Sequence, residues 1–401
     1  MERISTSGVM EEKIDLPSTT RTESNVKSRE RYFDYNLLII VIFLMSFGLV
    51  ILYSASAYGS QLMYGDNMHI FARQARISLV SFGVMLFLAL ITYHFYAKIA
   101  WLIYFSALIL MALVQSPLGV EVNGARRWLT VAGDITIQPS EFSKLALIIF
   151  LSYLICSYGK KAYSFQGTTR IAFAGLVMTL AVLFLTENFS TSIVIVAITV
   201  GLYFVIHPRY KLFVFLVVLI GIGMWALLRF LSESAAMSDD FRVNRILTWL
   251  NPEGQGEAGA FQVTQGLYAI GSGGFWGRGL GNGTQKLGSI PEVHNDMILA
   301  VIAEELGIFG VFILLLMFGM LLYRLMFIAN NAPDLFGSLL ATGIFIHIAV
   351  QVIINVAVVT NLLPTTGITL PFISFGGTSI LFLMAEMGVA LGISRRIVLT
   401  E

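Results

Sequence analysis

Ten runs of mostly apolar residues dominate this chain and constrain its fold more than any other feature. About 20 such residues let a helix cross the hydrocarbon core of a bilayer. We expect transmembrane helices at 36–56, 77–93, 98–115, 142–158, 170–186, 190–207, 211–231, 297–323, 336–358 and 372–393. Only 12% of the 401 residues are charged, about half the share in a soluble domain. The sequence therefore predicts an all-α, polytopic membrane protein of about ten transmembrane helices.

The expected helices divide the chain into three parts. Residues 1–35 are polar and rich in Ser, Thr and Glu, so we expect a disordered tail. The transmembrane domain covers 36–396 and leaves a short end at 397–401. Within it, a large loop at 232–296 separates helices 7 and 8, and a connection this long usually carries function.

Lys and Arg residues set the expected orientation, because they accumulate on the cytoplasmic side of a membrane. With a cytoplasmic N-terminus, most of them fall inside, including Arg395 and Arg396 after the last helix. We therefore expect a multi-pass protein of the cytoplasmic (inner) membrane with both termini in the cytoplasm and loop 232–296 outside.

Composition also excludes several classes of function. The single cysteine, Cys156, rules out an internal disulfide and a cysteine metal cluster. A net charge of +1 provides no field to recruit nucleic acid. The glycine-rich stretch 271–283 lacks the surrounding strand–helix–strand unit of a dinucleotide fold, so we expect no organic cofactor. No cluster shows recognisable metal-ligand spacing, and the metal site is unknown at this point.

Some basic residues fall on the outer side, against the usual bias: Arg126, Arg127, Arg278 and Lys286. One interpretation is contact with solvent or lipid headgroups, and the other is an anionic ligand. Glycines around Arg278 allow close backbone approach and present N–H groups to anions. This stretch is either a diphosphate cradle or a loose loop. The segment 241–250 is either an interfacial helix or an ordinary packed one.

A charged pair is expected at the start of the fourth helix. Glu141 and Lys144 are three residues apart and share one helix face, after a helix start at Pro139 and Ser140. Charges at the mouth of a membrane helix are costly unless they are partnered or wet. The pair either fixes helix packing or lines a substrate cavity.

Asp296 directly precedes the eighth helix and follows Glu292 and His294. It is either an N-cap for that helix or a general base in a partly dry cavity, where a raised pKa would help it accept a proton. The helix dipole would oppose that shift. The sequence leaves both interpretations open.

Two further features lie deeper in the membrane. Segment 361–379 contains Pro364 and Pro371, which forbid a smooth helix, so we expect a re-entrant element roofing a wet cavity. The intramembrane acids Glu304, Glu305 and Glu386 are either functional or hold helices together.

In this order, these motifs resemble the SEDS family (shape, elongation, division and sporulation), which includes FtsW and RodA. The matching stretches are 53–56, 123–128, 138–141 with Lys144, 245–246, 277–281, 291–296, 304–307 and 363–379. The family often has Pro-Asp-x-Gly-Thr before the sixth helix, whereas this chain has Glu-Asn-Phe-Ser-Thr at 187–191. The long tail and this variant favour the division member, FtsW, over RodA.

The resemblance implies a peptidoglycan glycosyltransferase that polymerises lipid II at the outer face of the membrane, with Asp296 as the essential aspartate and Glu141 and Lys144 as the cavity pair. It also implies a divalent cation, Mg or Mn, and a class B penicillin-binding protein as partner, with other divisome or elongasome proteins. Undecaprenyl diphosphate would leave, and cations would stabilise its charge.

We take the following as candidate substrate- or diphosphate-binding residues: Arg126, Arg127, Lys144, Glu141, Arg278, Lys286, His294, Thr378 and Ser379. The alternatives are a lipid II flippase, since buried charges also suit transport, and a non-catalytic scaffold for the penicillin-binding protein.

Overall fold

The computed structural model describes residues 32–122, 125–132, 135–207, 258–287 and 293–398, with Lys211 and Trp249. Several predictions concern segments outside these residues: the tail at 1–31, the helix at 211–231 beyond Lys211, the helix at 241–250 apart from Trp249, and Glu292. Residues 32–34 were expected in the tail but are packed, since Asp34 is fully buried.

In the described part of the chain, seven helices are long and apolar enough to cross a membrane. They are α1 (Tyr35–Tyr64), α2 (His69–Leu90), α5 (Pro139–Tyr158), α6 (Phe165–Leu185), α7 (Phe189–Ile206), α11 (Ile298–Asn331) and α12 (Leu335–Val359). Two shorter apolar helices are α4 (Ala100–Leu113) and α13 (Ser379–Ser394). Every expected span within the described residues is therefore confirmed as a helix.

The ends of these helices differ from the expected ones. α2 begins at His69 instead of 77, α11 continues to Asn331 instead of 323, and α13 begins at Ser379 instead of 372. The added start of α2 (69–76) contains Arg73 and Arg76 and is too hydrophilic to be read as a span, while α11 continues past Arg324 with mostly apolar residues until Asn331. The late start of α13 reflects Pro371, Gly376 and Gly377, which precede the helix and favour irregular backbone.

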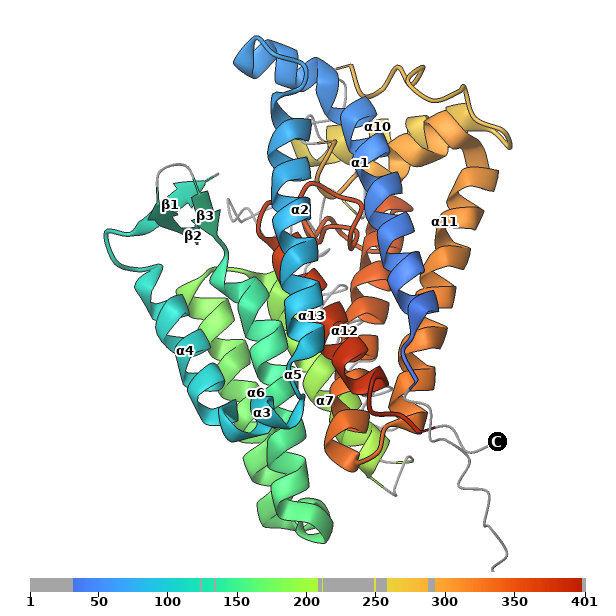
Figure 1. Ribbon diagram of the computed structural model, residues 1–401. Helices are drawn as coiled ribbons and strands as arrows, with labels where there is room; N and C mark the ends of the chain where they lie inside the picture. The colour runs from blue at the N-terminus through green and yellow to red at the C-terminus, as the bar shows by residue number, and fades with distance from the viewer. Residues whose placement is uncertain are drawn as a thin grey trace, which may run out of the picture.

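One element was not predicted at all. Residues 119–137 form a small antiparallel sheet in the order β1 (Gly119–Val122), β2 (Ala125–Ala132) and β3 (Ile135–Ile137). It leads directly into α5 and lies at one end of the helix bundle (Figure 1). We call this end, where the starts of α5 and α11 also lie, the sheet end.

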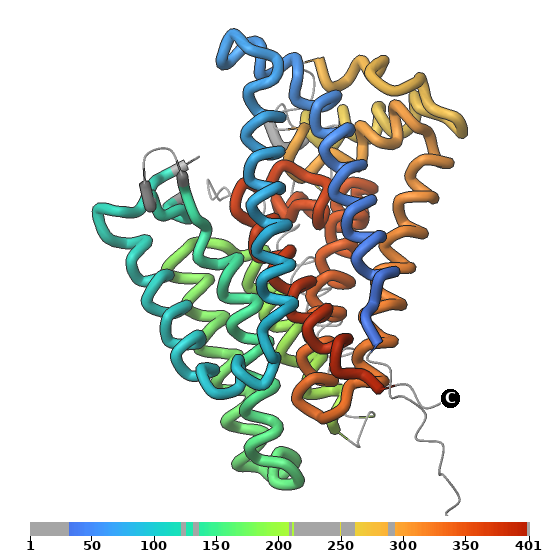
Figure 2. Tube along the Cα trace, viewed as in Figure 1, coloured from blue at the N-terminus to red at the C-terminus, as the bar shows by residue number. Residues whose placement is uncertain are grey.

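Two helices form the centre of the bundle (Figures 1 and 2). In the apolar stretches of α5 and α12, 67% and 61% of the residues are buried, against 22–39% in the other five long helices. α5 packs against α4, α6, α7 and α12, and α13 packs along α2. Polar side chains on α5 and α12 are therefore shielded from lipid.

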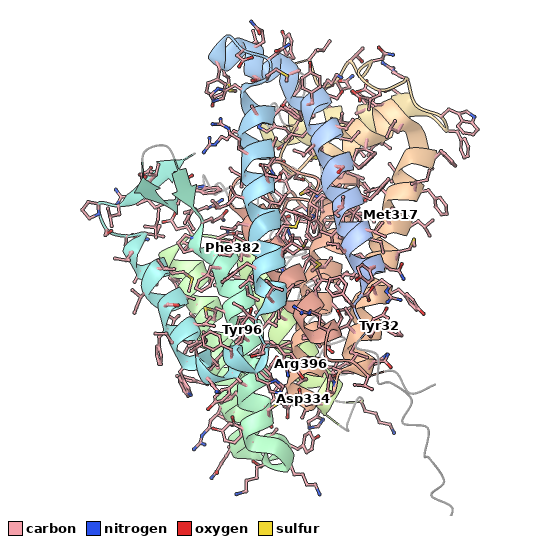
Figure 3. All side chains as sticks on the ribbon, in the orientation of Figure 1. Tyr32, Tyr96, Met317, Asp334, Phe382 and Arg396 are labelled. Atoms are coloured by element: carbon pink, nitrogen blue, oxygen red, sulfur yellow. The ribbon has the colours of Figure 1, made fainter. Side chains whose placement is uncertain are left out.

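Both described ends of the chain meet at the opposite end, which we call the termini end. The N–H of Tyr32 donates to the carbonyl of Ile397 at 3.2 Å, and Asp34 pairs with Arg324 on α11 at 2.7 Å. The short helices α3 (His94–Lys98) and η1 (Gly159–Tyr163) complete the described elements there, and α10 (Ala258–Gly273) lies at the sheet end. Figure 3 shows Tyr32, Asp334 and Arg396 near the point where the C-terminus leaves the bundle.

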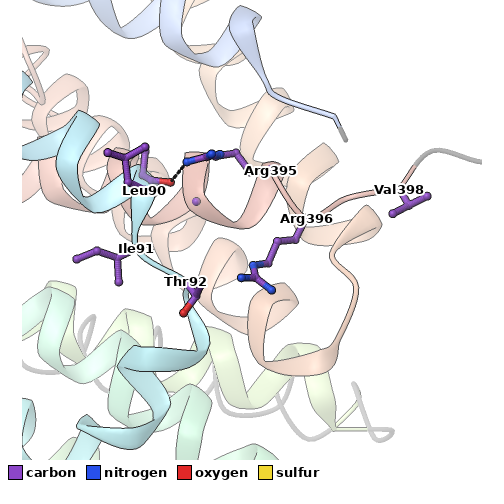
Figure 4. Close-up of a pocket in the computed structure, with 8 residues that line it drawn as sticks. Leu90, Ile91, Thr92, Arg395, Arg396 and Val398 are labelled. Carbon is purple, nitrogen blue, oxygen red and sulfur yellow. Dashed lines mark hydrogen bonds between the residues drawn. The ribbon is translucent and has the colours of Figure 1, made fainter. Parts of the chain in front are cut away.

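A cavity of about 410 Å³ also lies at the termini end, between the ends of α2 and α13. Its lining includes Thr92 and Arg396, and Arg395 donates to the carbonyl of Ala89 at 3.2 Å (Figure 4). Ala89 lies in the last turn of α2, so the Arg395 guanidinium offsets part of the negative charge at this helix end.

Candidate active site

The start of α5 carries the predicted ion pair. Pro139 opens the helix, and one turn later the ammonium of Lys144 lies 2.9 Å from the carboxylate of Glu141. Both side chains are nearly inaccessible, at 3% and 10% exposed. Ser379, the first residue of α13, donates its hydroxyl to Glu141. A buried pair that is hydrogen-bonded in this way tolerates a membrane environment.

Lys144 makes one further contact with the described residues, and it reaches α12. Its ammonium donates to Oε1 of Gln351 at 3.3 Å, and the amide N–H of Gln351 donates to the carbonyl of Thr369 at 3.0 Å. An ammonium has three N–H donors. Two of them are used by the described residues.

Asp296 lies just before α11 and is buried, with 9% of its surface exposed. Met297 occupies the N-cap position of that helix, so the aspartate precedes the cap. The side-chain amide of Gln262 on α10 donates to Oδ1 of Asp296 at 3.3 Å. The carbonyl of Asp296 accepts from Asn355 on α12 at 2.9 Å. The carboxylate is thus held by α10 while its backbone is fixed to α12.

The segment between α12 and α13 folds back inside the bundle without regular secondary structure, as predicted for a re-entrant element. Leu370, Phe372 and Ile373 are buried. Phe372 has φ +63, a left-handed conformation that is unfavourable for a bulky residue and is found mainly at functional sites. A Cβ on Gly48 of α1 would lie 2.5 Å from the carbonyl oxygen of Phe372, so only glycine fits there.

This segment joins the two halves of the site. The backbone N–H of Gln138, before α5, donates to the hydroxyl of Thr378 at 3.4 Å. The N–H of Phe375 donates to the carbonyl of His294 at 2.9 Å, near Asp296. Of the predicted residues, the structure therefore brings together Glu141, Lys144, His294, Asp296, Thr378 and Ser379.

The lysine of the glycine-rich stretch is bound by the chain itself. The ammonium of Lys286 donates to Glu305 at 2.5 Å, to Ser54 at 2.7 Å and to the carbonyl of Gly281 at 2.8 Å. All three of its donors are used. Lys286 therefore pairs with a carboxylate of the chain itself, and its role in binding a diphosphate stays a prediction.

Arg278 belongs to the same internal arrangement. It lies 3.5 Å from Glu304 and donates to Thr284 at 2.9 Å, while the N–H groups of Thr284 and Gln285 donate to the Glu304 carboxylate. Its side chain is 39% exposed, so a ligand can still reach it. The structure favours the interpretation in which Glu304 and Glu305 hold segments together.

Arg126 and Arg127 lie on β2, away from this buried cluster. Arg126 is half exposed and faces Glu121 of β1 at 3.7 Å. Arg127 donates to the carbonyl of Glu187, before α7, at 3.0 Å. Their role in ligand binding stays a prediction.

Three site residues were not identified from the sequence: Gln262, Gln351 and Asn355. The last two are polar positions four residues apart in an apolar run, and with His347 they form one face of α12. That periodicity was a usable signal, because polar side chains on one face of a membrane helix normally point into the protein.

Within the described residues, no group of three or more His, Cys, Asp or Glu side chains is arranged to hold a metal ion. The cavity carboxylate Glu141 is already bound by Lys144 and Ser379. The described residues of the site therefore do not fit a divalent cation.

Known proteins with similar sequences cover almost the whole chain. The family model described as cell cycle protein, for FtsW, RodA and SpoVE, matches residues 35–397. Stage V sporulation protein E of Bacillus subtilis is 38% identical over 363 residues, covering 90% of this chain and 97% of the relative. The probable peptidoglycan glycosyltransferase FtsW of Trichlorobacter lovleyi is 38% identical over 372 residues, covering 90% and 93%.

Solved structures share the fold. A chain from a peptidoglycan synthase complex that coordinates polymerization and crosslinking superposes with a TM-score of 0.73 at 26% identity, covering 90% of this chain and 98% of that one. The rod shape determining protein RodA of Thermus thermophilus gives a TM-score of 0.64 at 26% identity, covering 90% and 97%. With the family model matching from α1 to the end of α13, this integral membrane protein belongs to the FtsW, RodA and SpoVE family.

Proposed function

We propose that this chain is a peptidoglycan glycosyltransferase that polymerises lipid II at the sheet end of the bundle. One observation carries the proposal. Asp296 and Lys144 are fixed to Asn355 and Gln351, which lie one turn apart on α12. Four residues of helix rise about 6 Å, so the backbone of Asp296 and the ammonium of Lys144 are anchored close to each other on one face of α12. The relatives named as peptidoglycan glycosyltransferases support the same reaction.

The sheet end faces the outside of the cytoplasmic membrane in this proposal, and both termini are cytoplasmic. The support is the distribution of basic residues. Lys98 on α3, Lys160 and Lys161 on η1, and Arg395 and Arg396 after α13 all lie at the termini end. This is the bias expected for cytoplasmic segments.

In the reaction, the 4-hydroxyl of the terminal GlcNAc of one lipid-linked unit attacks the anomeric carbon of another. Asp296 accepts the hydroxyl proton as the new C–O bond forms. The bond between the anomeric carbon and the diphosphate oxygen breaks, and undecaprenyl diphosphate leaves with the electron pair. The remaining donor of Lys144 stabilises that developing charge. Glu141 and Ser379 keep the ammonium in place.

The outer arginines would assist at the cavity entrance. Arg126 and Arg278 are partly exposed at the sheet end, where a diphosphate headgroup would arrive. His294 and Thr378 contribute to the shape of the site through backbone and hydroxyl contacts. A divalent cation stays a prediction that no step here requires.

We further propose that a class B penicillin-binding protein is the partner, alongside other divisome or elongasome proteins. The structural likeness to a chain of a peptidoglycan synthase complex supports this. The identity to FtsW and SpoVE relatives favours a role in division or sporulation over elongation.

The test is polymerisation of defined lipid II by purified protein and its partner in detergent. Wild type forms glycan chains with no bilayer to cross, which a flippase or a scaffold would not do. Asp296→Asn abolishes the product while the melting temperature and partner binding stay unchanged. Asp66→Asn, at an exposed aspartate in the α1–α2 turn, is the matched control and remains active. Normal chain synthesis by Asp296→Asn would refute the assigned base.

A further inference from the structure

A second buried pair of charged side chains lies between the middle of α12 and the middle of α13, in addition to Glu141 and Lys144. Nδ1 of His347 on α12 is 2.9 and 2.8 Å from the two carboxylate oxygens of Glu386 on α13. The two side chains are 1% and 0% exposed. Nε2 of the same imidazole is 2.8 Å from Oε1 of Gln351. The pair is therefore connected through Gln351 to Lys144.

The direction of each hydrogen bond in this chain follows from its ends. A lysine ammonium can only donate and a backbone carbonyl can only accept. Since Gln351 lies between Lys144 and the carbonyl of Thr369, its Oε1 must be the acceptor and its Nε2 the donor. The imidazole nitrogen that faces the same Oε1 must then carry a proton. His347 is thereby a fixed donor to Gln351.

The other imidazole nitrogen shares a proton with Glu386, as an imidazolium beside a carboxylate or an imidazole beside a carboxylic acid. Either way, the pair is neutral. Glu141 and Lys144 are also neutral as a pair. The buried cluster thus carries no net charge, which allows it to persist away from water.

We propose that His347 is a positioning residue for glycosyl transfer: through Gln351, it holds the Lys144 ammonium so that its remaining donor faces the diphosphate. This rests on the proposed function. A lysine ammonium is a compact charge on a flexible four-carbon stem, and Glu141 alone leaves it free to rotate. The bond from His347 fixes Oε1 of Gln351 as the second anchor. His347 itself is separated from the substrate by Gln351 and Lys144.

Two double variants separate the effect of the hydrogen-bond donor to Gln351 from the effect of the charges on His347 and Glu386. His347→Leu/Glu386→Leu removes both charges and the donor to Gln351. His347→Gln/Glu386→Gln removes the charges but keeps a side-chain N–H within reach of Gln351. Thr342→Val is the matched control, because this buried α12 hydroxyl donates to the carbonyl of Ser338 within its own helix. Both double variants avoid an unpaired buried charge, which the single change His347→Leu would create.

The measurements are melting temperature in detergent, lipid II affinity, and initial rate of glycan synthesis at saturating lipid II. We expect both double variants to melt near wild type. The Leu/Leu variant loses about 10- to 100-fold in rate, the scale of a misplaced catalytic group, and binds lipid II more weakly. The Gln/Gln variant stays within a few fold of wild type in both, and Thr342→Val is unchanged.

A Leu/Leu variant as active as wild type would overturn the positioning role, and so would an equal loss in both double variants while both remain folded. If wild type bound lipid II without polymerising it, the proposed reaction would fail instead. The affinity comparison between the two double variants would still decide the role of His347.

Discussion

Gln351 and Asn355 lie one turn apart on α12 and donate to two adjacent carbonyls, those of Thr369 at 3.0 Å and Ile368 at 2.8 Å. The re-entrant segment 361–378 is thus attached to α12 by two neighbouring amides. The same two side chains also contact Lys144 and the backbone of Asp296. A shift of this segment should therefore move both the Lys144 ammonium and Asp296.

Replacing Asn355 with Leu removes the donor to two buried carbonyls, those of Asp296 and Ile368. Each unsatisfied group costs about 1–3 kcal/mol, so the melting temperature should fall. The rate of glycan synthesis should fall further than stability explains, because the backbone of Asp296 is released. Thr342→Val, at a buried hydroxyl on the same helix, should change neither quantity. Unchanged synthesis by a folded Asn355→Leu protein would contradict the link between α12 and the base.

Gly48→Ala tests whether the re-entrant segment must lie close against α1. The added Cβ would lie 2.5 Å from the carbonyl oxygen of Phe372 and 2.8 Å from the Cα of Ile373. Both are backbone atoms that cannot move away independently, so the segment must shift. We expect polymerisation to fall at least tenfold, the scale of a small misplacement in an active site.

Gly59→Ala is the control for this change, because it lies on the same helix and its Cβ would meet nothing within 4 Å. It should be neutral or slightly stabilising, as alanine favours helix more than glycine does. Equal effects of the two substitutions on polymerisation would show that helix propensity, and not the position of the segment, decides the outcome.

The helices and the Glu141–Lys144 pair could be predicted because both depend on local sequence. Hydropathy over about 20 residues marks a membrane helix, and a spacing of three residues places two side chains on one helix face. Glu141 and Lys144 are indeed 2.9 Å apart. The sheet was missed although Asn-Gly at 123–124 and Gly-Asp at 133–134 are typical hairpin turns.

The internal ion pair of Lys286 could not be predicted because its partners are distant in sequence. Ser54 is 232 residues away, and nothing near Lys286 indicates that α1 supplies an acceptor. A basic residue among glycines is equally consistent with an external anion and an internal carboxylate. Only the fold shows that Glu305 is the partner of Lys286. His347 and Gln351 have the same difficulty. Their spacing on α12 was visible in the sequence, but their partners on other helices were not.

The turn before α12 should make stability depend on acidic pH. Burial alone would raise the pKa of Asp334, but the N–H of Gly337, the hydroxyl of Tyr93 and His94 stabilise its charged form and lower the pKa overall. Because the folded pKa is below the unfolded value of about 3.9, the stabilisation is present above that value. It is lost as the pH falls through the folded pKa.

Asp334→Asn should therefore lower the melting temperature near neutral pH. It should also remove the part of the acid-induced fall in melting temperature that wild type shows below about pH 4. Asparagine is as good an N-cap as aspartate, so the contact with Gly337 remains. Melting curves in detergent from pH 3 to pH 8 would measure this. The same acid-induced step in wild type and variant would assign it to another carboxylate.

Lys144→Met and Lys286→Met should have different consequences, although both remove a buried lysine at the sheet end. Lys144 has one donor left after its described contacts, whereas Lys286 has none. Lys144→Met should therefore abolish polymerisation and weaken binding of lipid II. Glu141 keeps the bond from Ser379 but loses its cation, so the melting temperature should fall as well.

Lys286→Met should act chiefly through folding. It leaves Glu305 fully buried without its cation, and removing one partner of a buried pair costs about 3–5 kcal/mol. The melting temperature should drop sharply, while the double variant Lys286→Met/Glu305→Met should recover much of it because no charge remains unpaired. The lipid II affinity of the folded double variant, compared with that of Lys144→Met, shows which of the two lysines binds the diphosphate. Weak binding by the double variant would restore Lys286 as a diphosphate ligand, because its charge would then matter beyond the pair that it forms with Glu305.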